Sequence, residues 1–141
     1  MAVLKDKDKE KVKEIFKGID NDVTIVMFTQ EVECPHCEMT RTMLEEVAGL
    51  SDRISLEVHD FVADKDVAET YGVDKIPATV LIGEKDYGIR FYGVPAGYEF
   101  TVLIEEIRDA GKRDPGLSKE AMAELDKVDA PVHVQVLISP T

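Results

Sequence analysis

The sequence Cys-Pro-His-Cys at positions 34–37 contains the only two cysteines of the chain and separates two different residue patterns. The run 23–29 before it is short, apolar and rich in β-branched residues, which predicts a buried strand. Apolar residues after it recur with helical spacing, which predicts a helix over 34–48. Two thiols three residues apart on one helix face lie close enough to form and break a disulfide. The sequence therefore predicts a strand-to-helix turn that carries a cysteine pair.

The position of each residue in this turn suggests its role. Cys34 would lie at the helix N-terminus, where unpaired backbone N–H groups and the helix dipole favour a thiolate. Cys37, one turn further in, would be shielded and would act as the resolving thiol. Pro35 suits the first helical turn, and His36 can stabilise the Cys34 thiolate, which makes the disulfide more oxidising. We therefore expect Cys34 and Cys37 to be catalytic, and Pro35 and His36 to tune the pKa of Cys34.

Other uses of the cysteine pair make different predictions. A disulfide that closes so short a loop removes little chain entropy and would be a poor structural staple. Two cysteines supply half of a tetrahedral zinc site, and the three histidines show no ligand spacing, so we expect no metal site. A soft-metal binder would take up Cu(I) or Zn(II) stoichiometrically. A non-catalytic docking module would have idle cysteines with a thiol pKa near about 8.5. Glu31, Glu33 and Glu38 oppose thiolate formation at Cys34, whereas His36 favours it.

Composition limits the classes of protein to which the chain can belong. With 141 residues, 44% of them hydrophobic, it can bury one core but hardly two. The net charge of −12 argues against nucleic acid or an anionic membrane as a partner. No stretch is long enough to span a membrane, and the start is charged where a signal peptide would be apolar. We therefore expect a cytoplasmic protein. A single Asn and two Gln beside many Glu and Lys are compatible with a thermophilic source.

The rest of the first 113 residues alternates between helical and strand patterns. Val12, Ile15, Phe16 and Ile19 have helical spacing. Two apolar or alternating runs further along predict strands, and the turn 84–86 predicts a hairpin. This order of elements predicts a mixed sheet with helices on both faces. The expected elements are a helix over 8–17, strands over 54–60, 77–82 and 88–92, a short helix over 64–71 and a helix that ends at Gly111.

The segment from Gly72 to Thr79, Gly-Val-Asp-Lys-Ile-Pro-Ala-Thr, leads into the third expected strand. Together with Cys-Pro-His-Cys after the first strand, it resembles the thioredoxin superfamily. The resemblance implies an α/β thioredoxin fold, with three layers, α/β/α, around a mixed sheet of four to five strands. It also implies a cis peptide bond before Pro77, a Pro77 loop that lies against the disulfide, and backbone groups of Ile76 and Pro77 that bind an extended substrate strand. Gly93 stands where the family has a glycine after its hairpin strand.

The core strand departs from the thioredoxin pattern at one point. Thioredoxins carry a buried acid near the end of this strand that assists the resolving thiol, whereas this chain has Val-Met-Phe at 26–28. Proton transfer to Cys37 would then need another group or water, and Glu31, His59 and Asp60 are the candidates. The proline–histidine pair between the cysteines is similar to that of the periplasmic disulfide oxidant rather than to that of reducing thioredoxins.

A second, shorter copy of the opening pattern occupies the C-terminus. Residues 117–128 have helical spacing with Ser118 as an N-cap, and 132–138 have the pattern of a strand. Shifted by 109 residues, this segment overlays 16–28. The terminal strand is expected to dock on a sheet edge or to mediate a homodimer.

This arrangement is similar to that of the two-unit, glutaredoxin-like protein disulfide oxidoreductases of thermophilic prokaryotes, which are tandem thioredoxin folds with a CxxC in each unit. Residues 1–113 would then form a thioredoxin-fold unit with the Cys-Pro-His-Cys site. Residues 114–141 would be a linker plus the opening helix and strand of an incomplete second unit. The N-terminal module of a peroxiredoxin-reducing flavoenzyme also has two such folds. Its working cysteines lie in the second fold, which argues against that assignment.

The resemblance also implies a thiol–disulfide oxidoreductase and its mode of action. A Cys34 thiolate would attack a substrate disulfide, and Cys37 would resolve the mixed disulfide. The redox-active disulfide would serve without any other cofactor. The implied partners are protein or peptide thiols and disulfides, with a flavoprotein of the thioredoxin reductase type as the expected reductant.

Overall fold

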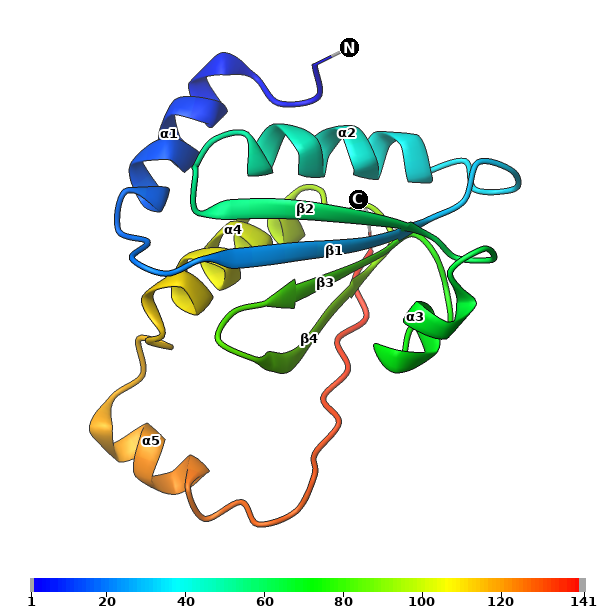
Figure 1. Ribbon diagram of the computed structural model, residues 1–141. Coiled ribbons are helices and arrows are strands. Elements are labelled where there is room, and N and C mark those ends of the chain that lie inside the picture. The colour runs from blue at the N-terminus through cyan, green and yellow to red at the C-terminus, as the bar shows by residue number, and fades with distance from the viewer. Residues whose placement is uncertain (1, 140–141) are drawn as a thin grey trace.

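Four strands form one mixed sheet in the computed structural model, which describes residues 2–139 (Figure 1). β1 (Val23–Thr29) lies inside the sheet, parallel to β2 (Ile54–Asp60) and antiparallel to β3 (Ala78–Ile82). β4 (Asp86–Tyr92) follows β3 in an antiparallel hairpin, so the strand order is β2-β1-β3-β4. The prediction of an α/β fold around a mixed sheet is confirmed, with four strands.

Helices cover both faces of this sheet (Figure 1). α1 (Asp6–Phe16), α2 (Cys37–Ala48) and α4 (Tyr98–Lys112) share one core cluster with side chains from all four strands. α3 (Lys65–Thr70) belongs to a second cluster on the opposite face. The three layers are those of a thioredoxin fold. Among the described helices, none is long and apolar enough to cross a bilayer.

β1 contributes to both clusters because successive side chains on a strand point to opposite faces. Ile25 and Met27 join the cluster with α1, α2 and α4, whereas Val26 and Phe28 join the cluster with α3. All four side chains are fully buried. A strand that is buried on both faces has a continuous apolar sequence, which explains why its bounds were predicted correctly.

The end of α4 is held against the turn that precedes β1. Asn21 donates hydrogen bonds from its backbone N–H (3.1 Å) and its side-chain amide (2.9 Å) to the Gly111 carbonyl. A Cβ atom on Gly111 would lie 2.5 Å from Cγ2 of Ile19, so this close approach requires glycine. The helix continues to Lys112, one residue beyond its predicted end, and α1 begins at Asp6, two residues before its predicted start.

The C-terminal segment leaves this body after α4 (Figure 1, orange to red). α5 (Lys119–Leu125) is a shorter form of the predicted helix, and the Ser118 hydroxyl caps it by accepting a hydrogen bond from the Ala121 N–H (3.1 Å). The predicted strand over 132–138 is wrong, because this stretch has no regular secondary structure and its apolar side chains are exposed. A strand needs a neighbour that pairs with its backbone groups, and none of the four described strands pairs with it. Residues 140–141 of the segment lie outside the described residues.

Candidate redox site

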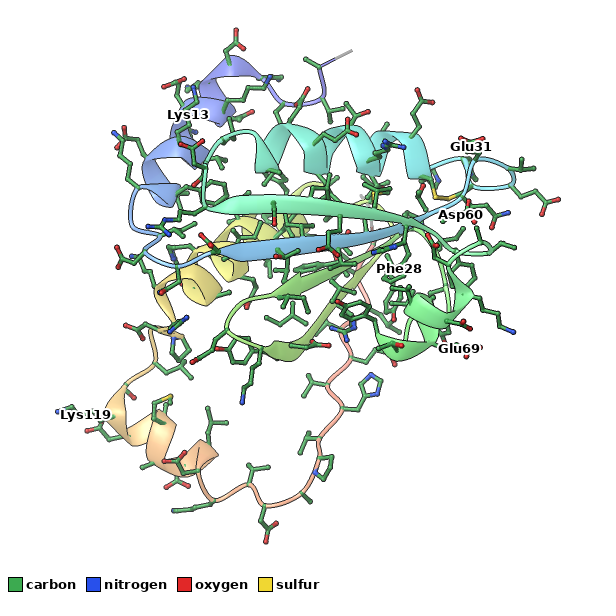
Figure 2. The ribbon with its side chains drawn as sticks, in the orientation of Figure 1. Lys13, Phe28, Glu31, Asp60, Glu69 and Lys119 are labelled. Carbon is green, nitrogen blue, oxygen red and sulfur yellow. A yellow bond between two sulfur atoms is a disulfide. The ribbon has the colours of Figure 1, made fainter. Side chains whose placement is uncertain are left out.

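Cys34 and Cys37 are joined by a disulfide at the amino end of α2 (Figure 2, yellow bond). Their Cα atoms are 5.4 Å apart, within the ordinary range for a disulfide. Cys34 is half-buried, whereas Cys37 is only 2% exposed. One member of the pair is therefore accessible, and the other is shielded by the protein.

α2 begins at Cys37 and not at Cys34 as predicted. The Cys37 N–H donates to the Cys34 carbonyl (3.2 Å), which closes a tight turn that contains Pro35. The first helical hydrogen bond runs from the Thr40 N–H to the carbonyl of His36, the N-cap residue (3.1 Å). Cys34 therefore lies just outside the helix, next to the unpaired N–H groups of its first turn.

The exposed side chains around the disulfide are mostly acidic. Glu31, Glu33 and Glu38 are exposed, and none of them forms an ion pair with another described residue. His36 is also exposed and is the basic side chain of the turn. Glu33 has a φ of +61°, in the left-handed region that non-glycine residues seldom adopt. The loop that leads from β1 to the disulfide therefore turns at Glu33, and its carboxylates lie within a few residues of the cysteines in the sequence.

The Ile76–Pro77 peptide bond is cis, as the thioredoxin resemblance implies. Pro77 directly precedes β3, and the Pro77 carbonyl accepts a hydrogen bond from the Gly93 N–H (2.9 Å). Gly93 has a φ of +88°, which explains glycine at this position. Because Phe28 pairs with the residue after Pro77, the proline loop lies at the same end of the sheet as the loop that leaves β1.

The candidate proton groups named from the sequence do not lie buried beneath α2. Glu31 is exposed. His59 stacks on Phe28 on the α3 face, with ring centroids 5.6 Å apart and its Nδ1 3.5 Å from Oδ2 of Asp64. Asp60 accepts hydrogen bonds at Oδ1 from two N–H groups of the following loop (2.9 and 2.8 Å). These interactions order the β2–α3 connection.

Two threonines are the buried polar residues of the described chain, and neither was predicted from the sequence to be functional. Thr40 lies in the first turn of α2 and donates its hydroxyl hydrogen to the His36 carbonyl (2.8 Å). Thr79 lies on β3, and its Oγ1 has no hydrogen-bond partner among the described residues. The sequence could have indicated Thr79 as a polar residue within an apolar strand, two residues after Pro77.

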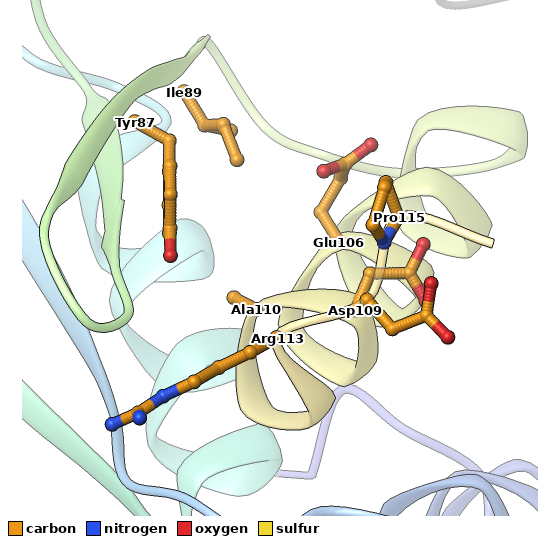
Figure 3. Close-up of a pocket in the computed structure, with 8 residues that line it drawn as sticks. Tyr87, Ile89, Glu106, Asp109, Ala110, Arg113 and Pro115 are labelled. Carbon is orange, nitrogen blue, oxygen red and sulfur yellow. The ribbon is translucent and has the colours of Figure 1, made fainter. Parts of the chain in front are cut away.

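Two concave surfaces lie away from the disulfide. One, of about 320 Å³, lies between β4 and the end of α4, where Tyr87 and Ile89 face Ala110 (Figure 3). Burial raises the pKa of Glu106 at its edge. The other, of about 570 Å³, lies between α1, α2 and α4 and includes Met39. Neither is lined by a cysteine. Within residues 2–139, no group of three or more His, Cys, Asp or Glu side chains has the arrangement of a metal site.

No family model matches the chain. A probable thioredoxin from Methanothermobacter thermautotrophicus is 33% identical over 88 residues, which cover 62% of this chain and 94% of that protein. NADH dehydrogenase from Bacillus subtilis is 24% identical over 133 residues, which cover 94% of this chain but 24% of that protein. The chain thus spans about a quarter of one relative and nearly all of the other.

Solved structures show the same fold. The F subunit of alkylhydroperoxide reductase from Enterococcus faecalis matches with a TM-score of 0.77 at 21% identity, over 89% of this chain and 61% of that chain. A protein disulfide oxidoreductase from Aeropyrum pernix matches with a TM-score of 0.77 at 23% identity, over 89% of this chain and 56% of that chain. The probable thioredoxin from Methanothermobacter is matched over nearly its full length, and the fold, the cis Ile76–Pro77 bond and the disulfide turn agree with that match. The chain belongs to the thioredoxin superfamily of thiol–disulfide oxidoreductases.

Proposed function

We propose that this chain exchanges its Cys34–Cys37 disulfide with the cysteines of protein substrates. The observation that carries the proposal is the unequal burial of the two cysteines at the start of α2. A substrate can approach the half-buried Cys34, whereas Cys37 is protected from intermolecular attack. The unpaired N–H groups of the first helical turn favour negative charge on sulfur at this position.

In the oxidising direction, a substrate thiolate attacks the Cys34 sulfur, and Cys37 leaves as a thiolate. A second substrate thiolate then attacks the substrate sulfur of the mixed disulfide, and Cys34 leaves. Two electrons and two protons pass in total from the substrate dithiol to the protein. In the reducing direction, Cys34 attacks a substrate disulfide, and Cys37 resolves the mixed disulfide.

The neighbouring residues take supporting roles in this proposal. Pro35 holds the tight turn between the cysteines, and His36 stabilises the Cys34 thiolate against the surrounding glutamates. Ile76 and Pro77 bind the substrate chain through backbone groups. The Pro77 carbonyl already accepts a hydrogen bond from Gly93, which favours the backbone of Ile76 as the group that pairs with the substrate.

The cysteine pair needs no further cofactor for this chemistry, because its disulfide accepts two electrons and its dithiol donates them. The reductant that fits best is a flavoprotein, since one relative is named an NADH dehydrogenase and one structural neighbour is a subunit of alkylhydroperoxide reductase. The partners are protein or peptide thiols and disulfides. The net charge of −12 disfavours nucleic acid and anionic membranes, and a cytoplasmic location suits a catalytic CxxC.

The division of the chain is also a proposal. Residues 1–113 form the thioredoxin-fold unit, and residues 114–141 are a linker plus a segment that matches the opening helix and strand of a second unit in sequence, although 132–138 forms no strand here. In support, α5 buries none of its side chains in this body, and the matched solved chains are longer than this one. In the chain by itself, the exposed apolar residues of 132–138 would pair two copies into a homodimer.

The catalytic proposal is tested by insulin reduction with dithiothreitol and by oxidation of a dithiol peptide. Cys34→Ser should abolish both activities, because no sulfur is then accessible to the substrate. Cys37→Ser should accumulate a mixed disulfide through Cys34, which mass spectrometry detects. An active Cys34→Ser protein would reject the assigned roles. A wild-type protein without activity, or one that binds Cu(I) stoichiometrically, would favour a docking module or a soft-metal binder.

A further inference from the structure

Thr79 is a buried polar residue whose hydroxyl makes no hydrogen bond among the described residues of the oxidised protein. Its side chain is fully buried on β3. A buried hydroxyl without a partner costs free energy relative to its hydrated state. The other buried threonine, Thr40, avoids this cost through its hydrogen bond to His36. The Thr79 hydroxyl can therefore donate a hydrogen bond to an acceptor that the described residues of the oxidised protein do not provide.

The strand register places the Thr79 side chain on the face covered by α2 and α4. Thr79 pairs with Met27 on β1 and with Phe91 on β4. Both partners belong to the core cluster that contains Leu44 and Val47 of α2, and residues directly opposite each other in a sheet share a face. The hydroxyl thus lies on the sheet face that α2 and α4 share, where α2 packs on β1 and β2 and α4 packs on β1 and β3.

The first turn of α2 lies at the same end of the sheet. Cys37 and Thr40 are the buried residues of this turn, and both positions face inward. β1 ends at Thr29 and is followed by the loop to the disulfide. Pro77 directly precedes β3, which begins at Ala78 at the same end of the sheet. Thr79 is the second residue of β3, directly after Pro77 and Ala78, so it lies at this end of the strand.

We propose that the Thr79 hydroxyl is the hydrogen-bond partner of the Cys37 sulfur in the reduced protein and that it thereby sets the redox potential of the pair. The inference rests on the proposed exchange function. In the disulfide, the Cys37 sulfur is neutral and is a weak acceptor. Reduction by two electrons and two protons from a dithiol breaks the S–S bond, and Cys37 becomes a thiol or thiolate that accepts a hydrogen bond. The end of β1 supplies no acid for this role, because residues 26–28 are Val-Met-Phe.

This arrangement favours the reduced state. The hydroxyl makes no hydrogen bond among the described residues when the cysteines are oxidised, and it makes one when they are reduced. The cost of burying an unpaired hydroxyl therefore destabilises the disulfide form relative to the dithiol form. Thr79→Val keeps the shape and removes the hydroxyl, which relieves the oxidised form and deprives the reduced form of a hydrogen bond. We expect the equilibrium constant for reduction to fall about tenfold, which corresponds to a potential lower by about 30 mV.

The experiment compares the wild-type full chain with Thr79→Val, Thr79→Ser and a control, Thr24→Val. Thr24 lies at the opposite end of β1, where its hydroxyl accepts a hydrogen bond from Ser55 (3.2 Å). Equilibration with glutathione gives each potential, and urea denaturation gives the stability of each redox form. Thr79→Val should stabilise the oxidised form, destabilise the reduced form and lower the potential. Thr79→Ser should restore the wild-type potential, and Thr24→Val should leave it unchanged.

Four results would overturn the inference. In the first, the equilibrium constant for reduction of Thr79→Val lies within twofold of the wild-type value. In the second, Thr79→Val changes the stability of both redox forms equally. In the third, Thr24→Val shifts the potential as much as Thr79→Val does, and in the fourth, Thr79→Ser has the potential of Thr79→Val. The proposed function fails in a different way, because the wild-type protein would then not equilibrate with glutathione at all.

Discussion

β1 and the C-terminal stretch 132–138 have similar sequences but different structures. Both are rich in valine, isoleucine and leucine or methionine, and 132–138 also contains His133 and Gln135. Val26 of β1 is 0% exposed, between β2 and β3, whereas Val134 is 80% exposed and belongs to no strand. The comparison shows that β-propensity describes how well a residue fits a paired, half-buried surface and does not by itself create a strand.

The two helices that precede these stretches differ in the same way. α1 buries Val12 and Phe16 in the core cluster with α4, whereas α5 buries none of its residues. α5 has a good N-cap in Ser118, yet it has only seven residues. A short helix is marginal on its own, so local signals define where it begins, and packing supplies most of the stability of a helix in a folded body.

The largest expected contrast comes from the same substitution in both regions. Leu44 on α2 is 0% exposed and Leu125 on α5 is 53% exposed. Leu44→Ala should lower the free energy of unfolding by about 3 kcal/mol, because it removes buried methyl groups and leaves a cavity. Leu125→Ala should change it by less than about 0.5 kcal/mol. Urea denaturation measures both, and a large loss for Leu125→Ala would show that α5 packs on the body in solution.

A glycine pair sharpens the comparison at the junction between the two regions. Gly111→Ala would place Cβ 2.5 Å from Ile19, so the end of α4 must shift, at a cost of about 2 kcal/mol. Gly116 has a φ of +66° but open space around it. Gly116→Ala strains only the linker and should leave the unfolding of the body unchanged. Thermal unfolding of both variants tests this, and similar melting temperatures would contradict the close packing at Gly111.

Ion pairs provide a smaller contrast, with a defined pH dependence. Asp86 binds Arg90 through two hydrogen bonds (2.9 and 2.7 Å), and this interaction, with one from the Gly88 N–H, holds the pKa of the Asp86 carboxyl below its usual value. A lowered pKa contributes stability above the ordinary value of about 3.9, and this stability is lost as the pH falls through the folded-state pKa.

Asp86→Asn should therefore cost about 1 kcal/mol at neutral pH and flatten the loss of stability in acid. The exposed pair Glu124–Lys127 on the C-terminal segment serves as a control. Glu124→Gln should have no measurable effect. Urea denaturation between pH 2 and pH 7 distinguishes the two, and parallel pH profiles for Asp86→Asn and wild type would contradict the assigned interaction.

The smallest effect is expected from removal of the whole C-terminal segment. A chain of residues 1–113 retains both core clusters and the disulfide turn. Its melting temperature should stay within about 2 °C of that of the full chain. Insulin reduction should also be unchanged. A clear loss of stability would show that the segment supports the body, and loss of a dimer in light scattering would support pairing through 132–138.

Much of the body could be predicted from the sequence because each element carries a local signal. β1 and β2 have their predicted bounds, since an apolar run and an alternating run of seven residues have few other uses in a folded chain. The cis bond before Pro77 and the Cys34–Cys37 disulfide were also expected. The start of α2 was predicted three residues early, because helical spacing does not reveal that the Cys37 N–H closes a turn onto Cys34.

The sequence by itself determined the order of the elements, the cysteine pair and the family likeness, because these depend on local periodicity and on a short motif. The tertiary structure alone decided that Cys34 is accessible while Cys37 is buried, that the Thr79 hydroxyl has no hydrogen-bond partner within residues 2–139 and that 132–138 forms no strand. The physical reason is that burial, pairing and hydrogen bonding are properties of contacts between distant segments. A residue pattern states what a segment can do, and its neighbours in space determine what it does.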